Sequence, residues 1–240
     1  MHRKRIPFHL TGIATLAVLS WASLVAPKAH AVEGTELNSS LGLWAPLLPE
    51  LRDDSGDSIG TVLSLSGHHR FAGFLTNVES GVTYGVTDSA EMFGFEMLLR
   101  DTWTLGDHEL SAGFGYSQMN WEQEDGQHFL DSDFHGAKIV GGWQTLFGRR
   151  PVWLDMSLGL YDMNGGYLGE DGVGGYNVAE TDEFATVFGF EWKTDVTCCG
   201  VPARTVFGLD YISDITTWQD GHIGTDDAVV LTGALELRLY

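Results

Sequence analysis

Apolar and polar residues alternate along much of the chain with a period of two. In the segment 184–195 the even positions carry Phe184, Thr186, Phe188, Phe190 and Trp192, and the odd positions carry Ala185, Val187, Gly189, Glu191, Lys193 and Asp195. Successive side chains of a β-strand point to opposite faces of the sheet. The alternation therefore predicts strands with one large apolar face and one small or charged face.

The same division occurs in eight segments, at residues 63–70, 93–100, 110–116, 137–147, 152–161, 184–195, 204–215 and 229–239. Short connections (105–107, 148–151 and 197–202) alternate with long ones (75–90, 121–133, 165–183 and 217–227). Barrels of the bacterial outer membrane have an even number of strands, short periplasmic turns and long outer loops. The pattern predicts an all-β, eight-stranded antiparallel up-and-down transmembrane β-barrel, with ten strands as the nearest variant.

The first residues have the composition of an export signal. Cationic residues in Met1–Arg5 precede an uncharged apolar run over 13–26, and the run ends before the small-residue triplet 29–31. This order is typical of a signal peptide, and the run is shorter than the roughly 20 residues of a membrane helix. We expect residues 1–31 to be a signal peptide cleaved after Ala31, residues 32–60 an N-terminal periplasmic lead-in, and residues 61–240 the barrel.

The composition and charge of the chain limit the classes of molecule that it can bind. The chain has 33 acidic and 13 basic residues, for a formal charge of −20, and 31 glycines against 6 prolines. Because nucleic acids are bound mainly through Lys and Arg, a nucleic-acid partner is excluded at this charge. No cofactor motif is found, and we expect none.

Over residues 61–240 the chain resembles small outer-membrane β-barrel proteins of the OmpA, OmpX and OmpW type, through its strand pattern and not through a motif. Tyr240 is similar to the terminal aromatic residue that the barrel assembly machinery reads, although it shares parity with Arg238 and Glu236 instead of with the apolar face. The resemblance implies an outer-membrane location, with contacts to membrane lipids and lipopolysaccharide and to the assembly machinery during insertion.

The glycine-rich parity also carries charges of both signs, which suits a narrow lumen. Charges held away from water need partners, so we expect a lumen charge network. Its predicted members are Arg70, Glu96, Arg100, Glu109, Lys138, Asp155, Glu191, Lys193, Asp210, Asp214, Glu236 and Arg238. The opposite assignment of the faces would give a soluble periplasmic β-barrel that binds a small apolar ligand.

The long connections are acidic and contain no Lys or Arg. Carboxylates bind divalent cations, so the weak metal candidates are Glu122, Glu124, Asp125, Asp131, Asp133, Glu180, Asp182 and Glu183. No calcium-loop motif is present, and simple solvation is the alternative. Cys198 and Cys199 are adjacent in a predicted periplasmic turn, where an oxidising envelope permits a vicinal disulfide.

The histidines are scattered and lack zinc spacing. An outer-membrane acyltransferase or deacylase on the same barrel is the enzymatic alternative, for which His135 with Ser132 and Asp131, or His128, could nominally serve. We expect no catalysis and a structural, adhesive or narrow small-solute role.

Overall fold

The computed structural model describes residues 34–47, 59–70, 76–124, 128–148, 150–170, 176–219 and 222–239. The predicted signal peptide and Tyr240 lie outside the described residues. Within the described part of the chain, no helix is long and apolar enough to cross a membrane.

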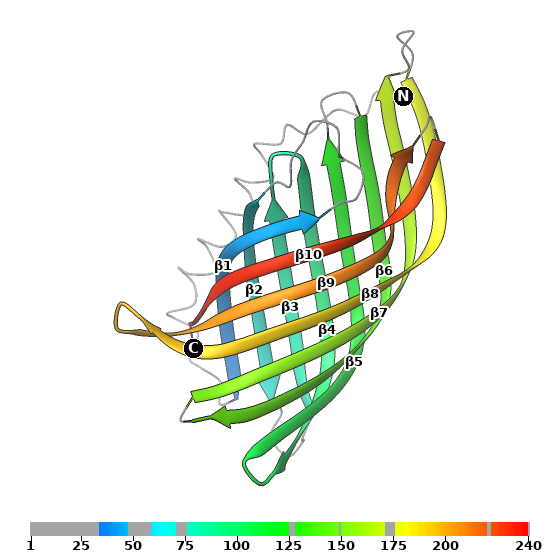
Figure 1. The fold of residues 1–240 in the computed structure, drawn as a ribbon. Coiled ribbons are helices and arrows are strands. Elements are labelled where there is room, and N and C mark those ends of the chain that lie inside the picture. The colour runs from blue at the N-terminus through cyan, green and yellow to red at the C-terminus, as the bar shows by residue number, and fades with distance from the viewer. Residues whose placement is uncertain are drawn as a thin grey trace. The chain divides into compact units, whose positions relative to one another are not determined.

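Ten antiparallel strands close into a barrel, in which consecutive strands are neighbours and β1 pairs with β10 (Figure 1). The strands are β1 Thr35–Leu47, β2 Gly60–Arg70, β3 Thr76–Val86, β4 Ala90–Leu105, β5 His108–Glu124, β6 His128–Phe147, β7 Arg150–Glu170, β8 Tyr176–Cys198, β9 Val201–Gln219 and β10 His222–Arg238. The prediction of a closed all-β antiparallel barrel is confirmed. The number of strands is ten and not eight.

The two additional strands occupy segments that were predicted to lie outside the sheet. β1 falls within the expected lead-in, residues 32–60, and pairs with β10 from Asn38–Arg238 to Leu47–Val229. β3 falls within the expected long connection 75–90 and pairs with both β2 and β4. The barrel therefore begins at Thr35, so the assignment of residues 32–60 to a lead-in and of the barrel start to residue 61 is wrong.

Apart from residues 48–59 between β1 and β2, the connections between strands have five residues or fewer. At one end β4–β5, β6–β7 and β8–β9 are joined by the predicted tight turns, where Gly106, Gly148 and Gly200 have positive φ. At the other end the predicted long loops are wrong, because the strands continue and leave only residues 87–89, 125–127, 171–175 and 220–221 between them. Most of the acidic residues expected in loops therefore stand on strand extensions.

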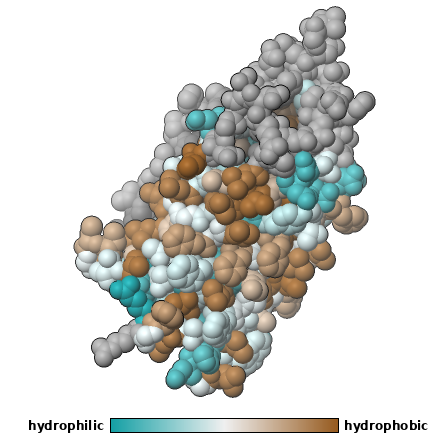
Figure 2. Space-filling view, viewed as in Figure 1, coloured by the Kyte–Doolittle hydropathy of each residue, from teal (hydrophilic) through white to brown (hydrophobic). Residues whose placement is uncertain are grey.

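The apolar parity faces outward. One row of paired positions around the wall consists of Leu99, Phe114, Ile139, Leu158, Phe188 and Tyr211, all exposed. Figure 2 shows apolar residues over much of the visible wall. This is opposite to the arrangement that the soluble-barrel alternative requires, in which the same side chains form the core.

An aromatic row borders this apolar wall near the tight turns. The row follows the strand pairing through Trp103, Leu110, Trp143, Leu154, Trp192 and Phe207. Toward the other end the outward face of β5–β7 becomes polar at Gln118, His135 and Asp162. On β8 the apolar stretch runs from Phe184 to Trp192, close to the roughly 9 to 11 residues with which a tilted strand crosses a bilayer.

Candidate functional site

Charged side chains from strands around the barrel meet in the lumen. Asp155 on β7 is central, because its Oδ1 accepts a hydrogen bond of 2.9 Å from Arg100 Nη1 and its Oδ2 lies 3.3 Å from Lys193 Nζ. Lys193 Nζ is also 2.6 Å from Glu191 Oε2. Arg100 Nε lies 3.1 Å from Glu79 Oε2, a charge contact that lacks hydrogen-bond alignment. Strands β3, β4, β7 and β8 are thus linked across the lumen.

Two further ion-pair groups complete this charged layer. Lys138 Nζ on β6 donates to Glu96 Oε2 on β4 at 2.7 Å. Arg204 on β9 lies between two carboxylates, 3.1 Å from Glu236 Oε1 and 3.3 Å from Asp195 Oδ1. The cations of these groups are therefore each paired with a carboxylate, as charges removed from bulk water need partners.

The structure places most of the predicted lumen residues in ion pairs and the other described ones outside them. The structure forms ion pairs with Glu96, Arg100, Lys138, Asp155, Glu191, Lys193, Glu236 and Arg238, the last with Glu36 at the rim. Asp210 lies in the lumen wall beside Gly189, whereas Glu109 is exposed next to the β4–β5 turn. Asp214 stands apart from the charged layer and accepts a hydrogen bond from Thr225. The side chain of Arg70 lies outside the described residues.

The sequence prediction missed four members of these pairs, namely Glu36, Glu79, Asp195 and Arg204. Glu36 and Glu79 belong to the two strands that were not recognised. Asp195 and Arg204 share the parity of the predicted lumen residues on their strands, so parity could have identified both.

Glycines make room for the charged layer. A Cβ atom added at Gly142 would lie 2.5 Å from Asp155 Oδ1, and one at Gly189 would lie 2.6 Å from Asp210 Oδ1. Both distances are shorter than real Cβ contacts. Glycine occupies these lumen-facing positions because the charged side chains of neighbouring strands fill the space that a Cβ atom would need.

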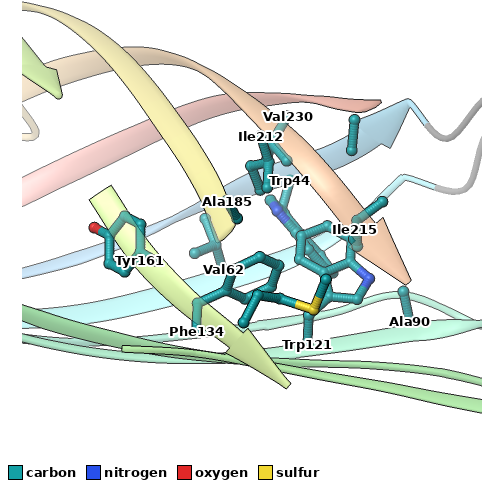
Figure 3. Packing of buried hydrophobic residues seen from close by; sticks show 12 residues of the cluster. Trp44, Val62, Ala90, Trp121, Phe134, Tyr161, Ala185, Ile212, Ile215 and Val230 are labelled. Carbon is teal, nitrogen blue, oxygen red and sulfur yellow. The ribbon is translucent and has the colours of Figure 1, made fainter. Parts of the chain in front are cut away.

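A second layer of the lumen, toward the end with the acidic strand extensions, is apolar (Figure 3). Its largest fully buried members are Trp44, Trp121, Phe134 and Met163. The two indoles meet edge to face with centroids 5.3 Å apart. Neither indole Nε1 has a hydrogen-bond partner, although both side chains are almost completely buried. We call this set, with Tyr161, Ile212 and Ile215, the apolar layer.

The end of β9 enters this layer. Pairing between β8 and β9 stops at Val187–Ile212, although β8 continues to Tyr176 and β9 to Gln219 (Figure 1). A bulge follows at once, because Ser213 and Asp214 both lie opposite the single residue Asp227 of β10. We call Ser213–Gln219 the inner segment.

Contacts across the lumen hold the inner segment. Thr216 N donates to Ser132 Oγ on β6 at 3.1 Å, and Thr216 Oγ1 lies 3.6 Å from Met163 Sδ on β7. Ile215 and Thr216 are both 0% exposed. The lumen at this level is therefore filled by a strand end and not only by side chains of the wall.

The described metal candidates lie on the strand extensions, where Glu122, Asp131, Asp133 and Asp182 have the outward parity and Glu183 has the lumen parity. Asp131 and Asp133 both accept hydrogen bonds from Asn120 Nδ2, at 2.9 and 2.8 Å, and Glu122 is paired with Asp131 across β5 and β6. Asp182 and Glu183 are exposed on β8. The side chains of Glu124 and Glu180, and all of Asp125, lie outside the described residues. Among the described residues, no group of three or more His, Cys, Asp or Glu side chains is arranged to hold a metal ion.

The nominal catalytic residues are not brought together. Ser132 is buried in the lumen and bound by Thr216, whereas His135 points outward and lies 3.6 Å from Asp162 Oδ2. Ser132 and His135 have opposite parity on β6 and so lie on opposite faces of the wall. The side chain of His128 lies outside the described residues.

Cys198 and Cys199 lie where β8 turns into β9, and both are free thiols in this structure. Cys199 has φ 52°, which places it in the left-handed region within the turn. The vicinal disulfide stays a prediction.

No protein-family model and no curated protein matches the chain. Among solved structures, the chain is similar to the translocator domain of the autotransporter NalP from Neisseria meningitidis, at 10% identity and a TM-score of 0.40, with 96% of this chain and 97% of that one covered. It is also similar to Neisserial surface protein A, at 10% identity and a TM-score of 0.35, covering 85% and 97% of the two chains. A TodX monoaromatic hydrocarbon channel mutant gives 7% identity, a TM-score of 0.34 and coverage of 90% and 93%. Likenesses this weak carry no argument about function.

Proposed function

We propose that this chain is a non-catalytic β-barrel of a bacterial outer membrane, with a structural role and a lumen that is closed at rest. The outward face carries the proposal. It is an apolar wall of about the height of a bilayer, bordered by the row that contains Trp103, Trp143 and Trp192, on a closed barrel. Tryptophan at one border is typical of a membrane interface.

The inside of the barrel supports the same assignment. Water cannot satisfy charged groups on a lipid-facing surface, and here the ion pairs around Asp155 and Arg204 are in the lumen. Ion pairs of the charged layer cross the lumen at one level, and the inner segment occupies it at a second level. A wide, permanently open diffusion pore is therefore not proposed.

Orientation and partners follow from the outer-membrane pattern. The start of β1, the end of β10 and the tight turns lie on the periplasmic side, and the acidic extensions of β5–β8 lie on the cell-exterior side, where divalent cations bridge them to lipopolysaccharide. Export uses the signal peptide cleaved after Ala31, and the assembly machinery reads Tyr240 during insertion. An acyltransferase or deacylase is not proposed, because Ser132 and His135 lie on opposite faces of β6.

Cell fractionation tests the proposal. The protein should sediment with outer membranes and resist extraction by urea and by alkaline carbonate. A lipid A modification assay on the same membranes should show no change in acylation. Recovery in the soluble periplasmic fraction would refute the membrane assignment, and altered lipid A acylation that depends on the protein would refute the non-catalytic assignment.

A further inference from the structure

β8 separates from β9 in the outer half of the apolar wall. The last pair, Val187–Ile212, adjoins the row of Phe188 and Tyr211, and beyond it the apolar stretch of β8 continues to Phe184, after which the described outward position is Asp182. Within hydrocarbon, the backbone groups of an unpaired strand edge are left without hydrogen-bond partners, which is strongly unfavourable. Beyond the hydrocarbon, water satisfies them. Between Val187 and Phe184 the parted edge of β8 lies within the apolar stretch, where Thr186 N donates to Ser213 Oγ at 2.8 Å, so few backbone groups of this edge are left inside the hydrocarbon.

The inner segment also has a hinge and a second place to pair. Asp214 has φ 62°, an uncommon conformation for a residue other than glycine, within the bulge that turns β9 inward. The edge of β8 from Tyr176 to Thr186 faces the space that β9 leaves, and Thr186 N of this edge donates a hydrogen bond to Ser213 Oγ of the inner segment at 2.8 Å. If the register of Val187–Ile212 continued without the bulge, Ile215 would lie opposite Phe184.

We propose that the inner segment is a gate on the lumen, and that the barrel passes small uncharged solutes when this segment leaves the apolar layer and pairs with the free edge of β8. The proposal rests on the proposed function as a membrane barrel. It adds to that function a second conformation of β9 and the class of solute that the barrel passes.

The apolar layer selects against ions. With Ile215 and Thr216 withdrawn, the route is still lined by Trp44, Trp121 and Met163, which offer no ligand for a charge. A desolvated ion is therefore strongly disfavoured there. The Nε1 groups of Trp44 and Trp121 are buried donors without partners, and a hydroxyl or carbonyl oxygen of a neutral solute would accept hydrogen bonds from them.

Engineered disulfides test the two states of the gate. All variants carry Cys198→Ser and Cys199→Ser, so that only the new thiols react. Ser132→Cys with Thr216→Cys should cross-link readily and hold the segment inside, since the two residues are in hydrogen-bond contact. Phe184→Cys with Ile215→Cys should cross-link only in the outward state. Thr194→Cys with Thr205→Cys joins the same two strands where they are already paired and serves as the matched control.

Transport is measured in proteoliposomes by swelling with arabinose as the neutral probe, and in planar bilayers as ionic current in NaCl. Oxidation of the 132–216 pair should reduce arabinose uptake to that of protein-free vesicles, and a reductant should restore it. The control pair should leave uptake unchanged. Ionic current should stay at baseline throughout.

Four results would overturn the gate: no arabinose uptake by the reduced protein, uptake unaffected by the 132–216 disulfide, no cross-link between residues 184 and 215, or ionic current as large as that of an open channel. Heat-modifiable gel mobility of the reconstituted protein separates this from failure of the proposed function. A protein that does not insert as a folded barrel contradicts the membrane assignment, whereas an inserted barrel with any of these four results contradicts only the gate.

Discussion

Replacing Phe188 by Arg should destabilise the inserted barrel far more than the same change at Phe184. Both phenylalanines are on β8 and on its outward face, and both are exposed, at 43% and 84%. Phe188 lies in the middle of the apolar stretch that ends at Trp192 and Phe184, whereas Phe184 is at its outer border. An arginine on the lipid face costs roughly 2 to 4 kcal/mol at the bilayer midplane and about 0 to 1 kcal/mol near the interface.

In equilibrium terms, Phe188→Arg should lower the folding constant by about 30- to 1,000-fold, and Phe184→Arg by about fivefold at most. The measurement is a guanidinium titration of protein in phospholipid vesicles, followed by tryptophan fluorescence and by heat-modifiable gel mobility. Gly94→Ser is the lumen-side control, because a Cβ there would come no closer than 3.8 Å to any neighbour. It should be near neutral.

Equal losses for the two arginine variants would refute the reasoning, because they would show that the position of residue 188 along the wall has no relation to membrane depth. A larger loss at residue 184 would do the same. A large loss for Gly94→Ser alone would mean that the two faces of the wall are exchanged.

Three further predictions follow from the lumen, the turn and the acidic face. Asp155→Asn should lower the free energy of unfolding by about 1.5 to 3 kcal/mol in the same titration, because Arg100 and Lys193 lose a charged partner. The control Asp162→Asn, at an exposed position, should change it by no more than about 0.5 kcal/mol. Equal effects of the two substitutions would contradict the lumen network. A membrane-impermeant maleimide should label Cys199 on cells only after the outer membrane is opened, and labelling of intact cells would reverse the orientation. Millimolar Ca²⁺ should protect the β5–β6 extension from protease on intact cells better than NaCl of equal ionic strength. The double substitution Asp131→Asn with Asp133→Asn should remove that difference. Equal protection by both salts would contradict cation binding and indicate a solvated acidic surface.

Strand parity predicted the parts of the barrel in which the two faces differ in polarity. On β4 and β8 the lumen is charged or small and the outside is apolar, so the period of two is plain in the sequence. The same parity placed Arg100, Asp155 and Lys193 on one side of the wall, where the structure pairs them.

The prediction failed where the lumen itself is apolar. In β1, Leu41 and Leu43 point outward and Trp44 points into the apolar layer, so both faces become apolar at the end of the strand and the alternation is lost there. Near the end of β9, the bulge at Asp214 exchanges the positions that face the lumen with those that face outward, and no residue type in that segment indicates the exchange.

In the acidic extensions the alternation is present with the opposite sense. On β6, Leu130 and Phe134 are buried in the lumen while Asp131 and Asp133 lie outside. An interpretation of the sequence that requires apolar outward faces assigns such a segment to a loop. The reversal is expected where a strand leaves the membrane and its outer face meets water, and it is the signal that could have extended β5 to β8.

Spin labelling along β8 tests the central assignment most directly. Single labels at each position from Phe184 to Lys193, in protein reconstituted in bilayers, report collisions with oxygen, which concentrates in lipid, and with a water-soluble nickel complex. Even positions should favour oxygen, with a maximum near Phe188, and odd positions should not. Equal collision ratios at even and odd positions, or nickel access throughout, would contradict a barrel wall embedded in lipid.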